Sequence, residues 1–260
     1  MYLSRLTLNP RTRRVQRELA NPYELHRTLM SAFPDKLPEG ERVLFRVDVD
    51  DRTGVPTVLL QSHSAPDWAW LGDPRANGYL MRAPESKPFE LTFTPGQTLA
   101  FHLRANPTVK LWLPEDAKDP DSKPKPMRVA LTTKKALCAW FDMDMQALEE
   151  ADLSELREQA LQLWLERKGE QGGFRVLRVT AIKEGNTYGR QPVKKVTEDA
   201  EEAVENAEKG PKTRALTHFA VRFEGVLQVT DSATLWETVK QGIGPAKSFG
   251  FGLLSLAPPH

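Results

Sequence analysis

The spacing of apolar residues predicts a strand in residues 1–8 and an amphipathic helix in residues 21–33. Residues 1–8 alternate between apolar and polar side chains, which is typical of a half-buried strand. Asn21 suits the N-cap of the helix, Pro22 suits its first turn, and Pro34 ends it. The apolar positions of this segment share one helix face, which we expect to be buried: Leu25, Leu29, Ala32 and Phe33.

The same pattern predicts four further elements before residue 110. Residues 42–50 and 55–62 are rich in β-branched residues and are separated by a turn containing Gly54, so they form a hairpin. Residues 67–71 predict a short helix, and residues 97–105 predict another strand. The resulting order, β-α-β-β-α-β, is that of a ferredoxin-like unit.

A second series of elements follows a charged, proline-rich insertion at residues 115–125. We expect strands at 128–132, 174–183, 216–229 and 250–256, a helical segment at 134–167 interrupted near Asp152, and a helix from the cap Asp231 to Lys240. The order β-α-β-β-α-β is thereby repeated.

The chain is therefore expected to be an α+β protein with tandem ferredoxin-like (RRM-like) domains. The expected boundaries are residues 1–110 for the first domain, 111–126 for a linker or insertion, and 127–260 for the second domain. A length of 260 residues suits two domains of ordinary size.

Composition limits the class of protein and its location. The hydrophobic fraction of 40% and the charged fraction of 27% are those of a globular protein. The single cysteine, Cys138, leaves no disulfide or cysteine-rich metal site. No apolar run approaches the length of a membrane span, so we expect a cytoplasmic protein without membrane contact.

The net charge of +1 conceals an uneven distribution of charge along the chain. Residues 1–34 contain six arginines and two acids, whereas residues 142–158 contain seven acids and one arginine. This asymmetry suits a polyanion bound on a basic surface, with solvent or a protein partner on the acidic one.

Three side chains on the flank of the first helix could handle a phosphate. Tyr23, His26 and Arg27 lie within two turns of a helix N-terminus, where the dipole and free N–H groups favour an anion. A histidine that exchanges protons near neutral pH, with donors to the phosphate, is sufficient to cut RNA through its own 2′-hydroxyl. From spacing alone, a half-buried histidine beside a tyrosine at a domain seam is the favoured interpretation. The other histidines lie in strand patterns or at the C-terminus: His63, His102, His218 and His260.

A glycine-rich segment at residues 242–252 is the second candidate. Its glycines allow close backbone approach, and Lys247 adds a cation. It matches neither a Walker loop nor a dinucleotide-binding loop. Phe249 and Phe251 resemble the stacking aromatics of RNA-recognition modules, whereas the structural alternative is a tight turn that packs the two domains together. No group of His, Asp and Glu has metal-ligand spacing, so we expect neither a catalytic metal nor a cofactor.

Residues 184–214 have basic flanks and an acidic centre. They are equally consistent with a solvated surface loop and with a basic hairpin whose arms lie in a nucleic-acid groove. The basic residues of the flanks are Arg190, Lys194, Lys195, Lys209, Lys212 and Arg214.

Four stretches together resemble the CasE (Cse3) family of CRISPR repeat endoribonucleases of the type I-E Cascade complex. They are Leu-Asn-Pro at 8–10, Ala-Asn-Pro-Tyr-Glu-Leu-His-Arg-Thr-Leu at 20–29, Leu-Arg-Ala-Asn-Pro at 103–107, and the glycine-rich segment ending in Gly-Leu-Leu at 252–254. The resemblance covers both halves of the chain. It implies metal-independent cleavage of precursor CRISPR RNA at the base of the repeat hairpin, with a 2′,3′-cyclic phosphate as product. It also implies that the enzyme stays on the product as a Cascade subunit beside other Cascade proteins.

The family's catalytic residues fall on His26 and Tyr23, and its groove-binding hairpin falls within residues 183–214. The hairpin is longer here and has an acidic centre, so single contacts in the RNA groove are not assigned. Ser31 stands where some relatives have a lysine, so a cation from elsewhere would have to compensate. The alternative is a non-catalytic subunit that only binds the RNA hairpin. The expected RNA-binding residues are Arg13, Arg14, Arg27, Arg104, Arg128, Arg190, Lys194, Lys195, Lys212, Arg214, Gly244, Lys247, Ser248 and Phe249.

Overall fold

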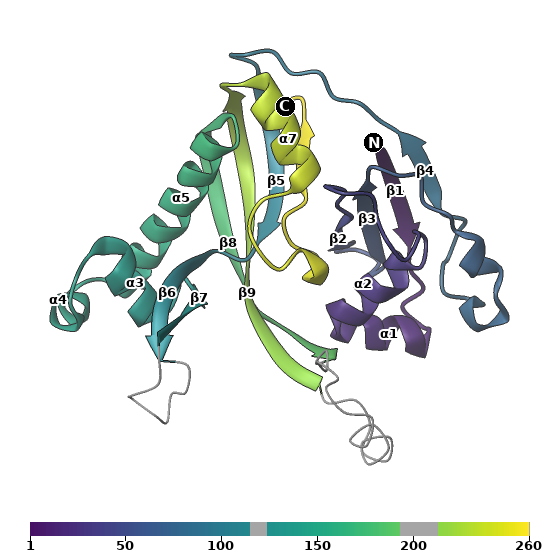
Figure 1. Cartoon of the computed structure of the whole chain (residues 1–260), viewed down its shortest axis with the longest axis horizontal. Coiled ribbons are helices and arrows are strands. Elements are labelled where there is room, and N and C mark those ends of the chain that lie inside the picture. Colours follow the sequence, from purple (N-terminus) through teal and green to yellow (C-terminus); the bar gives the residue numbers. More distant parts are fainter. Residues whose placement is uncertain (115–123, 193–212, 260) are drawn as a thin grey trace.

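The computed structural model describes residues 1–114, 124–192 and 213–259, and these form two α+β domains side by side (Figure 1). Each domain is built on a four-stranded antiparallel sheet. The strand orders are β2-β3-β1-β4 and β10-β5-β9-β8, so each sheet has the order expected for a ferredoxin-like unit. The predicted fold class is therefore confirmed.

The first domain packs two helices and two short 3-10 segments on its sheet. Its strands are β1 (Tyr2–Thr7), β2 (Leu44–Val49), β3 (Pro56–Ser62) and β4 (Glu85–Pro88). Its helices are α1 (Arg13–Ala20) and α2 (Pro22–Met30), and the 3-10 segments are η1 (Ala69–Gly72) and η2 (Pro74–Ala76). The apolar face predicted for residues 21–33 is buried in the core of this domain, with Leu25 and Leu29 at most 1% exposed.

The second domain holds the longer strands and helices. Its sheet contains β5 (Thr98–Ala105), β8 (Phe174–Pro192), β9 (Thr213–Val229) and β10 (Leu254–Ala257). Helices α3 (Lys134–Phe141), α4 (Met145–Glu150), α5 (Leu153–Gln171) and α7 (Ser232–Gln241) and the 3-10 segment η3 (Lys247–Phe249) complete it. A separate hairpin of β6 (Thr108–Pro114) and β7 (Pro124–Ala130) projects from the sheet (Figure 1).

Strand β5 lies in a different sheet from the one predicted. The sequence pattern assigned residues 97–105 to the first domain, but β5 pairs with β9 and β10 in the second sheet. The strand expected at 128–132 is instead β7, which pairs with β6 in a two-stranded sheet of its own among the described strands. The last strand of the first sheet is β4, a short polar strand without apolar alternation that the sequence pattern missed. The predicted boundary at residue 110 therefore separates β5 from its own sheet.

Two helical predictions need a similar correction. The segment predicted at 134–167 is three helices, because Asp142 adopts a left-handed conformation and Asp152 caps α5 by accepting from the N–H groups of Ser154 and Glu155. Helix α1 precedes α2 and was not predicted. Asp231 caps α7 as expected and accepts from the Thr234 N–H at 2.6 Å. The insertion predicted at 115–125 lies largely outside the described residues.

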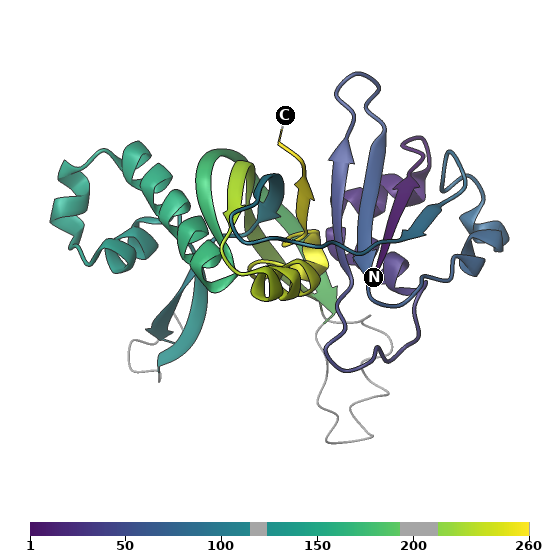
Figure 2. The same ribbon diagram turned by 90° about the horizontal axis from the view of Figure 1, so that it is seen from above.

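The two domains meet where strands β2 and β3 of the first domain contact helix α7, strand β10 and the glycine-rich segment of the second. The Gln61 side-chain amide donates to the Val239 carbonyl at 2.7 Å, and the Arg46 guanidinium donates to the Ser255 hydroxyl at 2.8 Å. Figure 2 shows the first domain beside the β10 edge of the second sheet. Because these contacts are made by buried residues, Gln61 at 2% and Arg46 at 7% exposure, the seam is part of the folded core. No helix in the described part of the chain is long and apolar enough to cross a membrane.

Candidate active site

Helix α2 begins at the seam and is attached there to the second domain. Asn21 occupies the N-cap position, as predicted, but its side chain makes no hydrogen bond to its own helix. Its Oδ1 atom instead accepts from the backbone N–H of Arg190 on β8 at 3.1 Å. The cap residue therefore fixes the first turn of α2 against the long β8–β9 hairpin.

His26 lies one turn into α2, with its ring packed over an aromatic neighbour. Its ring is nearly parallel to that of Phe45 on β2, with an interplanar angle of 11° and centroids 6.1 Å apart. Its Nδ1 atom is buried and has no hydrogen-bond partner among the described residues. Burial lowers the pKa of His26 from its ordinary value of 6.5, because the charged imidazolium loses hydration. The imidazole is therefore predominantly neutral at pH 7 and able to accept a proton.

Tyr23 lies beside His26 and packs against the second domain. Its ring centroid is 6.3 Å from that of His26 and 5.9 Å from that of Phe249. Tyr23 borders a small apolar cluster formed by Ala220, Phe249 and Phe251. The phenol is thus held next to the imidazole by contacts from both domains.

The glycine-rich segment places a lysine opposite His26. Gly242 has a φ of +71°, and a Cβ there would lie 2.8 Å from both the Gly252 carbonyl oxygen and the Leu44 side chain. Only glycine permits this close approach to β2. Lys247 donates through Nζ to the Gly244 carbonyl oxygen at 2.7 Å. The segment therefore packs the two domains together, which was one of the two interpretations of its sequence, and it also carries a cation, Lys247.

A cavity of about 450 Å³ lies between α2, the start of β2 and this segment. His26, Lys247, Ser248 and Arg42 all line it. The carboxylate of Glu41, which also lines it, accepts hydrogen bonds from the backbone and hydroxyl of Ser64. The structure thus gathers a neutral imidazole, a hydroxyl and two cations around one space large enough for a phosphodiester.

Ser31, where some relatives place a lysine, supplies no charge to this cavity. It is the C-cap of α2, and its hydroxyl donates to the Thr28 carbonyl oxygen at 2.6 Å. Lys247 and Arg42 are the cations that line the cavity instead. Sequence reasoning missed Arg42, since only the tertiary packing of β2 against α2 and η3 places it there.

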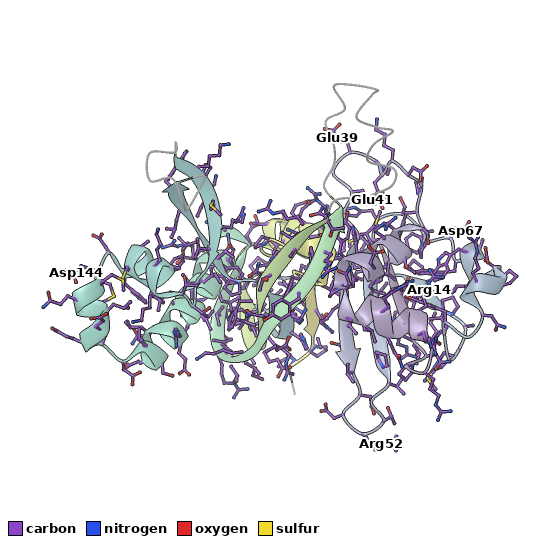
Figure 3. All side chains as sticks on the ribbon, turned by 90° about the horizontal axis from the view of Figure 1, so that it is seen from below. Arg14, Glu39, Glu41, Arg52, Asp67 and Asp144 are labelled. Carbon is purple, nitrogen blue, oxygen red and sulfur yellow. The ribbon has the colours of Figure 1, made fainter. Side chains whose placement is uncertain are left out.

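Arg14 is engaged inside the first domain. Its guanidinium donates to the buried carboxylate of Glu18 at 2.9 Å and lies 5.1 Å from the ring centroid of Tyr79. The hydroxyls of Tyr79 and Thr28 also donate to Glu18. Figure 3 shows Arg14 on the first domain. These contacts give Arg14 a structural role within the first domain, and with a side chain 31% exposed, its expected RNA contact stays a prediction.

Arg104 is held by neighbours on the second sheet. It donates to Glu184 at 2.6 Å and to the Thr187 hydroxyl at 3.0 Å, and it lies 4.5 Å from the ring centroid of Phe251. Together with Arg222, which pairs with the same carboxylate at 3.3 Å, it lines a cleft of about 810 Å³ beside α2. Its charge is partly compensated by Glu184.

The remaining predicted cations fall into two groups. Arg27 is exposed and pairs with Glu24 on its own helix at 3.1 Å. The other described arginines predicted to bind RNA are exposed: Arg13, Arg128, Arg190 and Arg214. Lys194, Lys195 and Lys212 lie outside the described residues, as does the acidic centre of the hairpin. The arms themselves are confirmed, because Arg190 pairs with Ala215 and Gln191 with Arg214 across β8 and β9.

The stacking role expected for Phe249 is wrong. Phe249 is 3% exposed and Phe251 is fully buried, so neither ring face is available to a base. Phe249 instead packs against His218 at a centroid distance of 4.5 Å. Gly189, which the sequence analysis did not single out, allows this packing, because a Cβ there would lie 2.4 Å from the Phe249 ring.

Two of the other described histidines have a polar side chain next to the ring. His218 contacts the Asn106 amide at 3.1 Å, and His102 lies 3.5 Å from the Glu224 carboxylate. His63 is not among the residues that line the His26 cavity. His260 lies outside the described residues. Of the described histidines, His26 and His102 each have a buried ring nitrogen without a hydrogen-bond partner and line a cavity with two cations. The cleft at His102 also contains three acidic residues, and His102 lies 3.5 Å from the Glu224 carboxylate, whereas Glu41 is the one acid among the described residues that line the His26 cavity.

Comparison with known proteins gives a consistent result over the whole chain. The model of a family described as CRISPR associated protein matches residues 1–258. The CRISPR-associated endoribonuclease Cse3 of Thermus thermophilus is 36% identical over 260 residues, which cover 99% of this chain and 100% of that protein. The CRISPR system Cascade subunit CasE of Escherichia coli K12 is 28% identical over 258 residues, which cover 99% of this chain and 100% of that protein.

The fold agrees with this similarity. The structure of Thermus thermophilus Cse3 bound to an RNA representing a pre-cleavage complex superimposes with a TM-score of 0.66 at 34% identity. The match covers 99% of this chain and 98% of that chain.

Proposed function

The chain belongs to the CRISPR-associated protein family, with the endoribonuclease Cse3 and the Cascade subunit CasE as relatives, and on that premise we propose that it cuts precursor CRISPR RNA at the base of the repeat hairpin. It then stays bound to the mature RNA as a Cascade subunit, in contact with other Cascade proteins. The support is the full-length similarity to an endoribonuclease whose structure holds a pre-cleavage RNA. The cytoplasm as the site of action is part of the same proposal.

The reaction we propose needs no metal. The 2′-hydroxyl before the scissile phosphate loses its proton to a base and attacks the phosphorus, and the leaving 5′-oxygen takes up a proton from an acid or from water as its bond to phosphorus breaks. The products are a 2′,3′-cyclic phosphate and a 5′-hydroxyl. His26 is the proton-transfer group, since burial keeps its imidazole neutral and ready to act as a base.

The other cavity residues act on the charge of the phosphate. Lys247 and Arg42 stabilise the negative charge that builds up on its non-bridging oxygens, in place of the lysine absent at position 31. Ser248 can donate a further hydrogen bond from the same wall. Tyr23 is not among the residues that line the cavity, and it orients the reacting hydroxyl or donates to the phosphate from its position beside His26.

The two arms of the β8–β9 hairpin and the exposed arginines near it hold the RNA stem. Arg190 and Arg214 lie on opposite arms, and Arg13 lies in the first turn of α1. Long antiparallel arms of this kind can enter a groove of a duplex. We propose that they position the base of the stem next to the His26 cavity.

One observation carries the catalytic assignment. A histidine with a buried, unpartnered Nδ1 lines a cavity that also contains two cations. Cleavage of the chain's own repeat RNA in excess chelator tests it, with a 2′-deoxy nucleotide at the scissile position as the matched substrate control. We expect cutting of the all-ribose RNA only. An RNA that is held tightly but never cut would identify the chain as a hairpin-binding subunit without activity.

A further inference from the structure

A second cavity of about 510 Å³ adjoins the His26 cavity. It lies between the β6–β7 hairpin, helix α5 and the glycine-rich segment. Pro245 and Lys247 line both cavities, so the glycine-rich segment is the wall between them. Its volume falls within the range of about 300–1,000 Å³ typical of ligand sites.

The lining of this second cavity is strongly basic. Five cationic side chains line it, and none of the described lining residues is acidic. The five are Lys110, Arg128, Arg167, Lys168 and Lys247. They come from the β6–β7 hairpin, α5 and η3, so the fold brings together charges that are far apart in the sequence.

The cations are packed closely enough to repel one another. Lys110 and Arg128 are direct cross-strand partners on β6 and β7, an arrangement that destabilises a sheet when both charges have the same sign. The pKa of Lys168 is lowered by burial and then by the neighbouring charges of Arg128 and Arg167. The side-chain amide oxygen of Gln171 is a neutral acceptor for Lys168 and does not compensate its charge. A bound anion would relieve this repulsion.

The cavity also offers flat apolar surface. The guanidinium of Arg167 lies 4.4 Å from the ring centroid of Trp140, and both side chains line the cavity. Cations combined with aromatic and guanidinium planes are typical of surfaces that bind single-stranded nucleic acid.

We propose that this basic cavity binds phosphodiesters of the unpaired RNA that continues from the scissile phosphate. The inference rests on the proposed function, since it assigns a path to the flanking strand of the same substrate. A strand whose reacting phosphate lies at His26 needs only to pass Lys247 to reach Lys168 and Arg128. The contacts are to the backbone, so this site is insensitive to base sequence.

The two cavities share Pro245 and Lys247 in their lining, and this favours RNA over an acidic protein segment as the occupant of the basic cavity. A protein partner would have to end at Lys247 to leave the His26 cavity open, whereas an RNA strand occupies both cavities continuously. The unpaired strand leaves the stem base on either its 5′ or its 3′ side. The 5′ and 3′ flanking strands have the same phosphodiester chemistry. Hairpins that are extended on one side or on the other distinguish which of the two strands binds.

The test measures affinity for three non-cleavable hairpins. Each carries a 2′-deoxy nucleotide at the scissile position, and they differ in having no extension, a short unpaired 5′ extension or a short unpaired 3′ extension. The full-length protein is compared with Lys110→Gln/Lys168→Gln and with the control Lys134→Gln/Lys135→Gln, whose exposed lysines lie on α3.

We expect one extension to raise the affinity of the parent and of the control by about tenfold, the effect of a charge-assisted contact. The Lys110→Gln/Lys168→Gln variant should lose this gain and keep its affinity for the hairpin without extension. The salt dependence of the gain should also fall, by a slope of about 0.7 for each phosphate that the variant no longer neutralises. The extension that produces the gain identifies the flanking strand.

The proposal is overturned if neither extension raises the affinity of the parent, or if the variant retains the full gain. Competition by polyglutamate, without any gain from an extension, would assign the cavity to an acidic protein partner. These outcomes are independent of catalysis. Cleavage of the all-ribose hairpin without extension still measures the proposed function, and its failure would leave the extension measurements unaffected.

Discussion

The side-chain oxygen of Asn21 accepts a hydrogen bond from the backbone N–H of Arg190 at 3.1 Å, so the N-cap residue of α2 is bonded to the β8–β9 hairpin. Gly189 makes this contact possible. A Cβ at Gly189 would lie 2.4 Å from the Phe249 ring and 3.0 Å from the Asn21 oxygen. This contact couples the position of the β8–β9 hairpin to that of helix α2, which carries His26.

Gly189→Ala should therefore separate β8 from α2. We expect a lower melting temperature and a loss of cleavage larger than the loss of RNA affinity, because the stem is still held but misplaced relative to His26. Thermal unfolding, binding and single-turnover cleavage measure the three effects. Gly72→Ala is the matched control, since a Cβ there meets nothing within 4 Å. Equal losses of affinity and rate in Gly189→Ala would contradict this link.

The pH dependence of cleavage should show His26 acting as a base. Burial puts its pKa below 6.5, and a base is active only when deprotonated. The value of kcat/KM, which reports the free enzyme, should therefore fall as the pH drops, with an acidic limb below 6.5 that is absent from any residual activity of His26→Ala. A rate that instead falls as the pH rises through this range would make His26 the acid.

Lys247 should matter for the chemical step at saturating RNA. We expect Lys247→Ala to slow single-turnover cleavage roughly a hundredfold, the typical effect of removing one group that stabilises transition-state charge. Lys247→Arg should retain part of the rate because it keeps the charge. The exposed Lys134→Ala is the control for a missing surface charge. If Lys247→Ala cleaved at the rate of the parent, Lys247 would not stabilise the transition state, and Arg42 would be the remaining cation that can do so.

Arg14, Thr28 and Tyr79 donate hydrogen bonds to the Glu18 carboxylate. Substitutions that remove these bonds should lower the stability of the protein and leave its RNA affinity unchanged. Tyr79 is 1% exposed, and its hydroxyl donates to the Glu18 carboxylate at 2.5 Å. Tyr79→Phe removes a hydrogen bond to a buried charge and should lower the free energy of unfolding by about 1.5–3 kcal/mol. Urea unfolding measures this change.

Arg14→Gln tests the internal role of the arginine in the same cluster. It should also destabilise the protein, because it leaves Glu18 with one partner fewer. The salt dependence of RNA binding should stay at the value of the parent, whereas Arg13→Gln should reduce it. If the RNA affinity of Arg14→Gln depended less steeply on salt than that of the parent, Arg14 would be a residue that contacts the RNA.

Local patterns in the sequence predict the elements whose apolar residues alternate or recur clearly. The strands β1, β2 and β3 and the buried face of α2 are of this kind. The resemblance to a known family then identifies His26 and the glycine-rich segment. Their proximity follows from the fold, which brings α2 and η3 to the same cavity.

The features that were missed depend on contacts between distant residues. Strand β5 alternates correctly, but its sheet is set by pairing with β9, which follows more than a hundred residues later. Strand β4 is polar throughout and joins β1 without an apolar face of its own. Phe249 looks like an exposed aromatic in a glycine-rich segment, yet Gly189 and Tyr23 enclose it.

The central claim is that the imidazole of His26 carries out the chemistry on the RNA. The most direct measurement is single-turnover cleavage of the repeat hairpin in excess chelator by the parent and by His26→Ala, with the affinity of both for the non-cleavable hairpin measured in parallel. We predict that His26→Ala binds the hairpin within about twofold of the parent, since the imidazole that it removes is neutral at pH 7. Its cleavage rate should fall at least about a hundredfold, the lower range for removal of a general base. Cleavage by His26→Ala at the rate of the parent would contradict the account.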